Sequence, residues 1–211
     1  MLTYENQLWE QGYRLIAGID EVGRGCLAGG VVAAAVIFPV GLRIPEVKDS
    51  KQLTPKKRHE LYDQILDQCI SFAVSMVDER VIDRINIRQA ARLAMKQAVE
   101  TLSTCPEYLL IDAETIDTKL PQKGIVKGDC LSHSIAAASI LAKVYRDRKC
   151  AEWDQIYPGY GLKQNKGYCT REHCEALKKL GPAPIHRKSF LSKILSPVQE
   201  EVQIGFHFGW G

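Results

Sequence analysis

The sequence predicts an α/β fold, in which helices pack against a sheet. Two apolar runs stand close together near the start of the chain, and the second is rich in Val, Ala and Ile, as expected for a pair of strands. Further apolar runs then alternate with helical patterns. The 211 residues, 45% of them hydrophobic and 25% charged, are enough for one domain with a substantial core.

The first half of the chain is expected to form an antiparallel hairpin, a helix and a third strand. A glycine-rich turn separates the two strands of the hairpin. The dipeptide Thr54-Pro55 has the pattern of a helix start, because threonine caps helices and proline fits their first position. The expected strands cover residues 14–22, 29–38 and 71–77, and the helix covers residues 55–69.

The second half is expected to contain three helices and a short strand. A helix is predicted over 86–102 because Ala90, Leu93 and Ala94 recur at spacings of three and four. The strand, 108–111, ends on Asp112. The other two helices cover 129–149 and 171–180, and the last of them stops at Gly181-Pro182.

The net charge of +3 is unevenly distributed along the chain. Residues 1–118 hold 13 Lys and Arg against 17 Asp and Glu, whereas residues 119–193 hold 15 against 6. A basic segment of this kind is typical of a face that binds a polyanion such as nucleic acid. A merely soluble surface is the alternative explanation.

Seven cysteines are scattered without paired spacing, which predicts free thiols in a cytoplasmic protein. No run approaches the ~20 apolar residues that cross a bilayer, and the polar N-terminus does not resemble a signal peptide. Structural zinc is the alternative use of these cysteines. Cys130 precedes His133, and Cys169, His173 and Cys174 cluster in sequence, but no Cys-x-x-Cys spacing occurs.

Two adjacent carboxylates, Asp20 and Glu21, end the apolar run 15–19 and precede a glycine-rich stretch. Charges at the end of a buried strand cost several kcal/mol unless a cation or hydrogen-bond donors compensate them. Oxygen ligands beside a flexible backbone suit a hard divalent ion such as Mg²⁺ or Mn²⁺. A strand that stops at a polar turn is the alternative.

Two further acids qualify as metal ligands by position. Asp112 ends its strand as Asp20 does, so the two carboxylates would emerge at one sheet edge if the strands are neighbours. Asp129 precedes a helix, where a capping role is expected and is compatible with metal binding. Glu114 and Asp117 lie in a polar loop and are expected to be solvated. Four clustered carboxylates repel one another unless divalent ions neutralise them.

The string GIDEVGRG, followed by LAGGVVAAAVI, resembles the opening of ribonuclease HII, the type 2 ribonuclease H of bacteria. The resemblance continues through DSKQLT, LLIDAE, KGDCLSHSIAAASILAKVYRDR and NKGYCTREHCEAL to HRKSF. It implies a ribonuclease H-like mixed sheet flanked by helices, with a C-terminal helical segment. The catalytic core would cover 13–150 and the helical segment, which completes the substrate site, 151–195. Residues 196–211 form a tail of unknown role.

The resemblance implies an endonuclease that cleaves the RNA strand of RNA–DNA hybrids and single ribonucleotides embedded in duplex DNA. It would leave 3′-hydroxyl and 5′-phosphate ends and act as a monomer. Mg²⁺ or Mn²⁺ ions, two per site, would be bound by Asp20, Glu21, Asp112 and Asp129. The alternatives are a ribonuclease HIII-like enzyme, which typically carries an extra N-terminal domain, and an inactive nucleic-acid-binding module whose hybrid binding ignores Mg²⁺.

The resemblance also implies how the substrate is contacted. Main-chain groups of Gly23, Arg24 and Gly25 would sense the 2′-hydroxyl, the group that separates RNA from DNA locally. Tyr168 would pack against the sugar beside the scissile phosphate. Other family phosphate contacts match Ser50, Lys51 and Asn86.

The helix after Asp129 presents a stripe of small and basic residues along which a phosphate backbone could lie. Close helix packing is the alternative explanation of its small residues. The members of this stripe are Ser132, Ala136, Ser139, Lys143 and Arg146.

The chain departs from the family pattern at four turn positions. The family usually has proline where this chain has Cys26 and Gly30, and glycine where it has Ala113 and Cys169. None of these positions is an implied metal ligand, so activity is still expected. Cys169 could alter how tightly the neighbouring Tyr168 is held.

Overall fold

The computed structural model describes residues 1–195 and contains a five-stranded mixed sheet of order β3-β2-β1-β4-β5. The first three strands are antiparallel neighbours, whereas β4 lies parallel to β1 and β5 lies parallel to β4. The α/β class, the hairpin and the mixed sheet are thus confirmed. The strands are β1 (Ile16–Val22), β2 (Val31–Ile37), β3 (Ser71–Val77), β4 (Tyr108–Asp112) and β5 (Gln122–Ile125).

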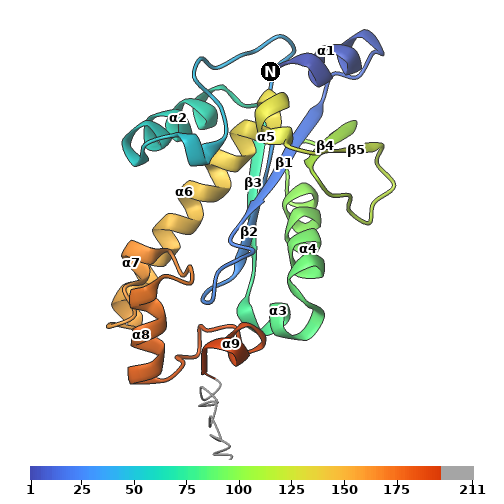
Figure 1. Ribbon diagram of the computed structural model, residues 1–211. Coiled ribbons are helices and arrows are strands. Elements are labelled where there is room, and N and C mark those ends of the chain that lie inside the picture. Colours follow the sequence, from blue (N-terminus) through green and yellow to red (C-terminus); the bar gives the residue numbers. More distant parts are fainter. Residues whose placement is uncertain (196–211) are drawn as a thin grey trace, which may run out of the picture.

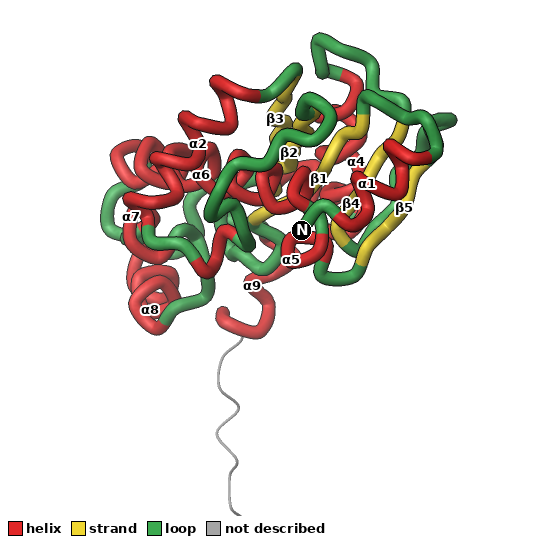
Figure 2. Tube along the Cα trace, turned by 90° about the horizontal axis from the view of Figure 1, so that it is seen from above, coloured by secondary structure: helices red, strands yellow, loops and turns green. Residues whose placement is uncertain are grey.

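Helices cover both faces of the sheet. Figure 1 shows α6 on one side and α4 on the other, and the view from above in Figure 2 shows the same layers. The helices are α1 (Thr3–Glu10), α2 (Pro55–Gln68), α3 (Glu79–Ile85), α4 (Ile87–Glu100), α5 (Gly128–Leu131), α6 (His133–Ile156), α7 (Leu162–Asn165), α8 (Arg171–Leu180) and α9 (Lys188–Leu195), with a short 3₁₀ turn, Ser50–Gln52, before α2.

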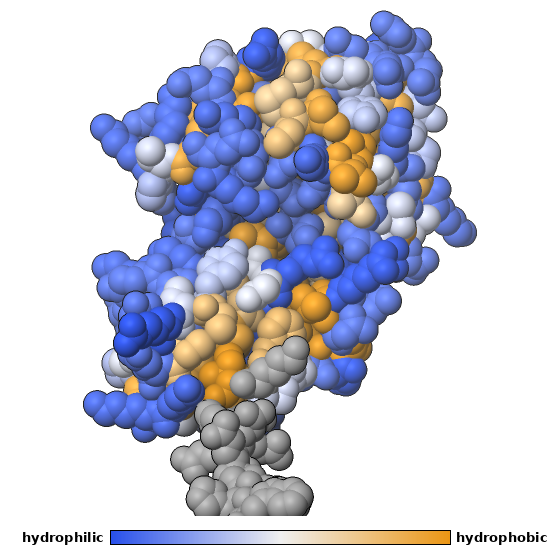
Figure 3. Space-filling model, in the orientation of Figure 1, coloured by the Kyte–Doolittle hydropathy of each residue, from blue (hydrophilic) through white to orange (hydrophobic). Residues whose placement is uncertain are grey.

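Strand β2 is buried on both faces, which explains its uninterrupted apolar sequence. Because strand side chains alternate between faces, Val31, Ala33 and Ala35 pack with α4, and Val32 and Ala34 pack with α6. All seven residues of the strand are buried. Hydrophilic residues cover most of the face seen in Figure 3, and hydrophobic residues gather there in separate patches. None of the helices in residues 1–195 is long and apolar enough to span a membrane.

Several elements differ from the sequence prediction. The predicted helix over 129–149 is two helices, because Ser132 adopts an extended conformation (φ −115°, ψ 131°) between α5 and α6. Asn86, with φ at 67°, separates α3 from α4 and accepts hydrogen bonds from the first turn of α4. The sequence prediction missed α1, α3 and β5, which are short and polar. Helix α6 continues through residue 150, where the catalytic core was expected to end.

Two buried arginines hold the C-terminal segment against the hairpin. Arg146 of α6 donates to the carbonyl oxygens of Ala28, Gly30 and Lys166. The side chain of Arg187, just before α9, donates to those of Gly23, Arg24 and Gly29. Both guanidinium groups are fully buried, and together they fix the hairpin turn relative to α6 and α9.

Two buried histidines predict a loss of stability in acid. Burial is the main reason that the pKa values of His133 and His186 are lowered to about 4. Both histidines are therefore neutral in the folded protein. Their stabilising contribution is complete above the unfolded pKa of about 6.5 and is lost as the pH falls toward about 4, by up to roughly 3 kcal/mol each.

Urea unfolding at pH 7 and at about pH 4.5 measures this loss. In His133→Gln and His186→Gln the free energy of unfolding should differ less between the two pH values than in the wild type, because glutamine does not titrate. The exposed His59 supplies the control, and His59→Gln should leave the difference unchanged. Equal pH dependence in all four proteins would contradict the assignment.

Candidate active site

The end of β1 and the end of β4 bring two predicted carboxylates to one edge of the sheet. Strands β1 and β4 are parallel neighbours, and Ile19 pairs with Ile111. Asp20 and Asp112 follow this pair directly, so both lie where the paired segment ends. The condition that these two strands are neighbours is therefore met.

Asp20 and Glu21 point to opposite faces of the sheet, because successive strand residues alternate. A Cβ on Gly18 would come within 2.1 Å of Ser134 of α6, so Gly18 and Asp20 face α6. Ile19 packs among the residues of the α4 side, and Glu21 shares that side. Asp20 therefore faces the layer that contains α6, whereas the adjacent Glu21 faces the layer that contains α4.

Asp112 and Asp129 meet at the short helix α5. The amide of Gly128 donates to Oδ1 of Asp112 at 2.7 Å, and Asp129 lies buried in the first turn of the same helix. The predicted capping role of Asp129 is wrong. The residue before α5 is Lys127, and Ser132 caps α6 through its hydroxyl.

Burial and neighbouring negative charges raise the pKa values of Asp20, Glu21 and Asp112. Burial first, and then the negative charges of Glu21, Asp112 and Asp129, raise the pKa of Asp20 well above its ordinary value. Burial likewise raises the pKa of Glu21, with Arg24 acting in the opposite direction. The pKa of Asp112 is also raised, first by burial and then by Asp129, against the effect of the Gly128 amide. This pattern is typical of carboxylates that lack a compensating cation.

The donor set fits a hard divalent cation. Oε2 of Glu21 is buried and has no hydrogen-bond partner among residues 1–195, so a ligand is needed to satisfy it. Asp129 also belongs to a second group of donors, because ligand atoms of Asp49, Asp129 and Cys130 lie within 4.8 Å of one another. Asp49 was not predicted as a site residue, although the DSKQLT string contains it. These groups form an acidic cluster able to bind metal.

Lys51 faces the same cluster. Its Nζ lies 3.9 Å from Oδ2 of Asp129. Burial lowers the pKa of Lys51, but the surrounding carboxylates, first Asp49 and then Asp20, outweigh it and raise this pKa. The Lys51 side chain is 79% exposed, so its charge is also available to an anion from solution.

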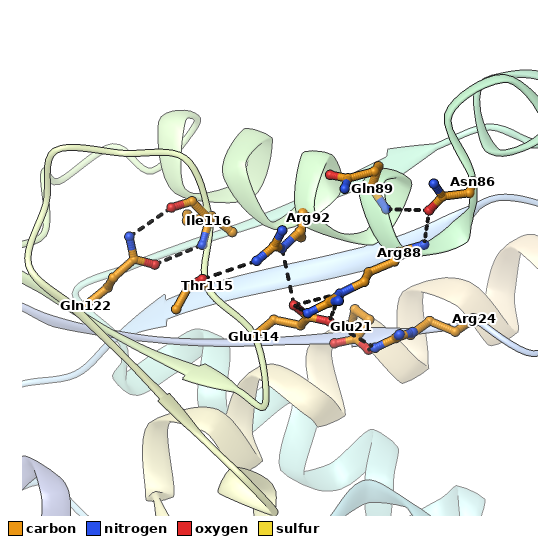
Figure 4. Close-up of polar contacts among 10 residues, drawn as sticks. All are labelled: Glu21, Arg24, Asn86, Arg88, Gln89, Arg92, Glu114, Thr115, Ile116 and Gln122. Carbon is orange, nitrogen blue, oxygen red and sulfur yellow. Dashed lines mark hydrogen bonds and ion pairs between the residues drawn. The ribbon is translucent and has the colours of Figure 1, made fainter.

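Glu114 lies between Arg24, which contacts Glu21, and the arginines of α4, as Figure 4 shows. Its carboxylate is buried and forms ion pairs with Arg88 at 3.0 Å, Arg92 at 3.2 Å and Arg24 at 3.8 Å. Arg24 in turn contacts Oε1 of Glu21 at 3.3 Å. The prediction that Glu114 is solvated is therefore wrong. Its partners lie 22 to 90 positions away, so no local pattern could reveal them.

Replacing Glu114 with glutamine should weaken the position of Arg24 beside Glu21. We expect Glu114→Gln to lose roughly 10-fold in cleavage rate and about 1–3 kcal/mol in stability, because three guanidinium groups share this acceptor. Cleavage assays and urea unfolding measure the two effects. The same substitution at the exposed Glu100 of α4 is the control. A Glu114→Gln protein as active as Glu100→Gln would rule out the positioning role.

The two glycines of the hairpin turn differ in what the fold demands of them. Gly23 has φ at 95°, and a Cβ there would come within 2.3 Å of Nε of Arg146. Gly25 is exposed and has ordinary φ, and a Cβ added there would meet no atom within 4 Å among residues 1–195. The carbonyls of Gly23 and Arg24 are fixed by Arg187, a residue that the HRKSF string contains but whose role sequence reasoning missed.

The other predicted substrate residues occupy varied environments. Ser50 and Ser139 are buried and bonded to each other, with the Ser50 amide donating to the Ser139 hydroxyl at 3.3 Å. Lys143 pairs with Asp147 at 2.6 Å. Asn86 is exposed at the start of α4. Arg146 is fully buried and bonded to carbonyl oxygens, so its guanidinium group does not reach the surface as a phosphate contact would.

Tyr168 presents its ring at the surface, with 40% of the residue exposed. Its backbone pairs with that of Cys26, so Tyr168 lies beside the turn that contains Gly23 and Gly25. Burial and the neighbouring Cys26 raise the pKa of Tyr168, so the phenol is neutral at physiological pH. A neutral, partly exposed ring suits a contact with an apolar sugar face.

The sequence cluster around His173 does not form a zinc site. Nδ1 of His173 lies 2.8 Å from the Tyr168 carbonyl oxygen, and its Nε2 lies 3.1 Å from Nε2 of His186. Both ring nitrogens are thus engaged. All seven cysteines are free, as predicted.

The departures from the family pattern have local explanations. Gly30 packs where a Cβ would come within 2.6 Å of the Val77 carbonyl oxygen. Cys26 is buried with its Sγ 3.6 Å from the Lys166 carbonyl oxygen. Ala113 has φ at 51°, a left-handed conformation that glycine adopts more easily.

The sheet order and the acids at the ends of β1 and β4 are those of a ribonuclease H-type fold. The family model described as ribonuclease HII matches residues 17–193. The chain therefore belongs to the ribonuclease HII family.

Known relatives agree with this assignment. The chain is 58% identical over 200 residues to a ribonuclease HII of Alkaliphilus metalliredigens (strain QYMF), covering 92% of this chain and 98% of that protein. The crystal structure of the ribonuclease H2 from Pyrococcus horikoshii OT3 is similar, with a TM-score of 0.73 and 28% identity over 85% of this chain and 96% of that one. A structure of a PCNA:RNase HII complex from Archaeoglobus fulgidus gives a TM-score of 0.70 and 27% identity, covering 82% and 94%.

The chain is accordingly a ribonuclease H, an endonuclease that hydrolyses RNA in RNA–DNA hybrids and belongs to a divalent-metal-dependent family. The family match sets aside the ribonuclease HIII alternative and the inactive binding module.

Proposed function

We propose that this enzyme cleaves both long RNA–DNA hybrids and single ribonucleotides embedded in duplex DNA, leaving 3′-hydroxyl and 5′-phosphate ends. The observation that carries the proposal is the set of carboxylates at the ends of β1 and β4, with Oε2 of Glu21 buried and unpartnered among residues 1–195. Asp20, Glu21, Asp112 and Asp129 would be the metal ligands. When bound, two Mg²⁺ or Mn²⁺ ions supply the charge that activates water and stabilises the leaving oxygen.

The protein groups around the acids prepare this chemistry. Arg187 holds the Gly23 and Arg24 carbonyls in place, so a 2′-hydroxyl can be read by fixed acceptors rather than by a mobile loop. Lys51 and Lys143 would contact phosphates, and Asn86 would extend the contact to α4. Tyr168 would pack on the sugar next to the scissile phosphate. The enzyme would act as a monomer.

Digestion of a duplex that contains one ribonucleotide tests the proposal. With Mg²⁺ or Mn²⁺ we expect a single cut beside the ribonucleotide, with a 3′-hydroxyl and a 5′-phosphate at the ends. An all-RNA hybrid should also be cut, whereas an all-DNA duplex and reactions with EDTA should remain intact. Cleavage of the all-RNA hybrid alone would contradict the proposed substrate range.

Gly25 gives a separate test of how the 2′-hydroxyl is recognised. Because the fold leaves space around Gly25, Gly25→Ala should keep the melting temperature of the wild type. A methyl group on the substrate side should still lower cleavage by about 10-fold, through one lost hydrogen bond. Gly23→Ala should instead lower the melting temperature, because Arg146 occupies that space. Full activity in Gly25→Ala would exclude close substrate approach at this residue.

A further inference from the structure

Two cysteine thiols face each other at the start of α8. Thr170 caps this helix through its hydroxyl, which accepts from the His173 amide. Cys169 comes immediately before the cap and Cys174 is the fourth helical residue. Side chains at these two positions commonly pack together and fix the direction in which the chain enters a helix. Here the two Sγ atoms lie 3.3 Å apart.

The two thiols differ in accessibility. Cys169 is exposed and Cys174 is half-buried. Burial, and then the contact with Cys169, raise the pKa of the Cys174 thiol. Cys169 is therefore the sulfur that an oxidant from solution meets first, and Cys174 is held in position to react with the product.

We propose that Cys169 and Cys174 are a reversible oxidation site that forms an intramolecular disulfide when the protein meets a peroxide. The Cys169 thiolate attacks a peroxide oxygen, breaks the O–O bond and becomes a sulfenic acid. The second oxygen leaves as hydroxide and takes up the proton that the Cys169 thiol released on ionisation, which gives water. The Cys174 sulfur then attacks the Cys169 sulfur, which forms the S–S bond and releases a second water. Two thiols and one hydrogen peroxide thus give one disulfide and two waters.

The geometry requires little movement of the neighbouring residues. The sulfurs must approach from 3.3 Å to ~2.05 Å, a distance that side-chain rotation and small backbone adjustments can supply. The backbone of Tyr168 is anchored separately. Its amide donates to the Asn165 carbonyl at 3.0 Å, and its carbonyl accepts from the Thr170 amide at 2.8 Å. The disulfide is therefore expected to leave the backbone of Tyr168 in place.

Disulfide formation protects the surface around Tyr168 from a negative charge on oxidised Cys169. Without a second thiol, a peroxide would carry Cys169 on to a sulfinic acid, which is negatively charged and irreversible. That charge would stand next to Tyr168 and repel a phosphate backbone. This consequence, although not the disulfide itself, rests on the proposed contact between Tyr168 and the substrate.

Peptide mapping tests the proposal directly, because trypsin separates the two cysteines. Cleavage after Lys166, Arg171 and Lys178 places Cys169 in peptide 167–171 and Cys174 in peptide 172–178. After treatment of the folded wild type with hydrogen peroxide, we expect these peptides as a cross-linked pair that dithiothreitol separates. Cys105→Ser, which removes a distant exposed thiol, should behave like the wild type. The proposal would be overturned if the wild type gave no cross-linked pair and its peptide 167–171 carried a sulfinic acid.

Cleavage assays on the same samples test the protective consequence. The oxidised wild type should keep its activity, whereas peroxide-treated Cys174→Ser should lose several-fold and should not recover with dithiothreitol. Melting curves of both proteins before treatment confirm that they fold. A cross-linked wild type that loses activity while its Cys130 stays unmodified in the peptide map would overturn the protective role. If the untreated wild type fails to cleave, the proposed substrate is contradicted instead. Failure of the proposed substrate can thus be distinguished from failure of the protective role.

Discussion

Asp20→Asn should abolish cleavage, with a loss of at least about 10³-fold in rate. The amide keeps the shape of the side chain but removes the negative charge that a divalent ion needs, and a metal contribution of several kcal/mol to the transition state corresponds to this factor. The site has no substitute at this position, because Asp20 is the acid that the central strand β1 presents on the α6 side. The measurement is single-turnover cleavage of a duplex with one ribonucleotide in saturating Mg²⁺.

Melting temperatures distinguish the loss of a metal ligand from damage to the fold. In the metal-free wild type, the pKa of Asp20 is raised, so its ionisation destabilises the folded protein as the pH rises through that pKa. Metal-free Asp20→Asn should therefore melt higher than the wild type at neutral pH, and the difference should shrink as the pH falls. Mg²⁺ should raise the melting temperature of the wild type but not of the variant.

Asp67→Asn serves as the matched control, because Asp67 is an exposed carboxylate on α2. It should leave cleavage and the response to Mg²⁺ unchanged. Near-normal turnover in Asp20→Asn would show that the proposed ligand set is wrong. A variant that melts lower than the wild type in the absence of metal would contradict the electrostatic account.

The sheet edge that carries Asp20 and Asp112 could be predicted from the sequence because its signals are local. The apolar runs before Asp20 and Asp112 mark strand ends, and the glycines after Glu21 mark a turn. An acid at the end of a buried strand is also typical of a polar turn, so the assignment of all four acids as metal ligands depends on the family resemblance. The parallel pairing of β1 with β4 then brings the two strand ends together.

The supporting contacts could not be predicted because they join distant segments. Glu114 has the sequence context of a loop residue, and only the packing of α4 places Arg88 and Arg92 over it. Arg146 shares a helical stripe with small residues, and nothing local shows that its guanidinium group turns inward to carbonyl oxygens. The break between α5 and α6 could not be predicted either, because a single residue in an extended conformation, Ser132, divides a continuous helical pattern.

Tyr168→Ala should impair cleavage at a single embedded ribonucleotide by roughly 5- to 150-fold. A stacking-type contact of an aromatic ring is worth about 1–3 kcal/mol, and this range converts to that loss in rate. The ring is 40% exposed beside the hairpin turn, so its removal leaves no large cavity. Tyr168→Phe should keep most of the activity, because the ring rather than the hydroxyl makes the proposed contact.

A structural role for Tyr168 predicts a different pattern, and stability distinguishes the two. If the residue mainly supports the fold, Tyr168→Ala should melt lower and lose activity on single-ribonucleotide and all-RNA substrates alike. If the ring packs on the sugar, the variant should melt like the wild type, keep its stabilisation by Mg²⁺ and lose most activity where only one ribonucleotide is present. The anchors of the Tyr168 backbone favour the second pattern, since they involve main-chain atoms that alanine retains. Full activity in a stable Tyr168→Ala protein would exclude the residue from the substrate site.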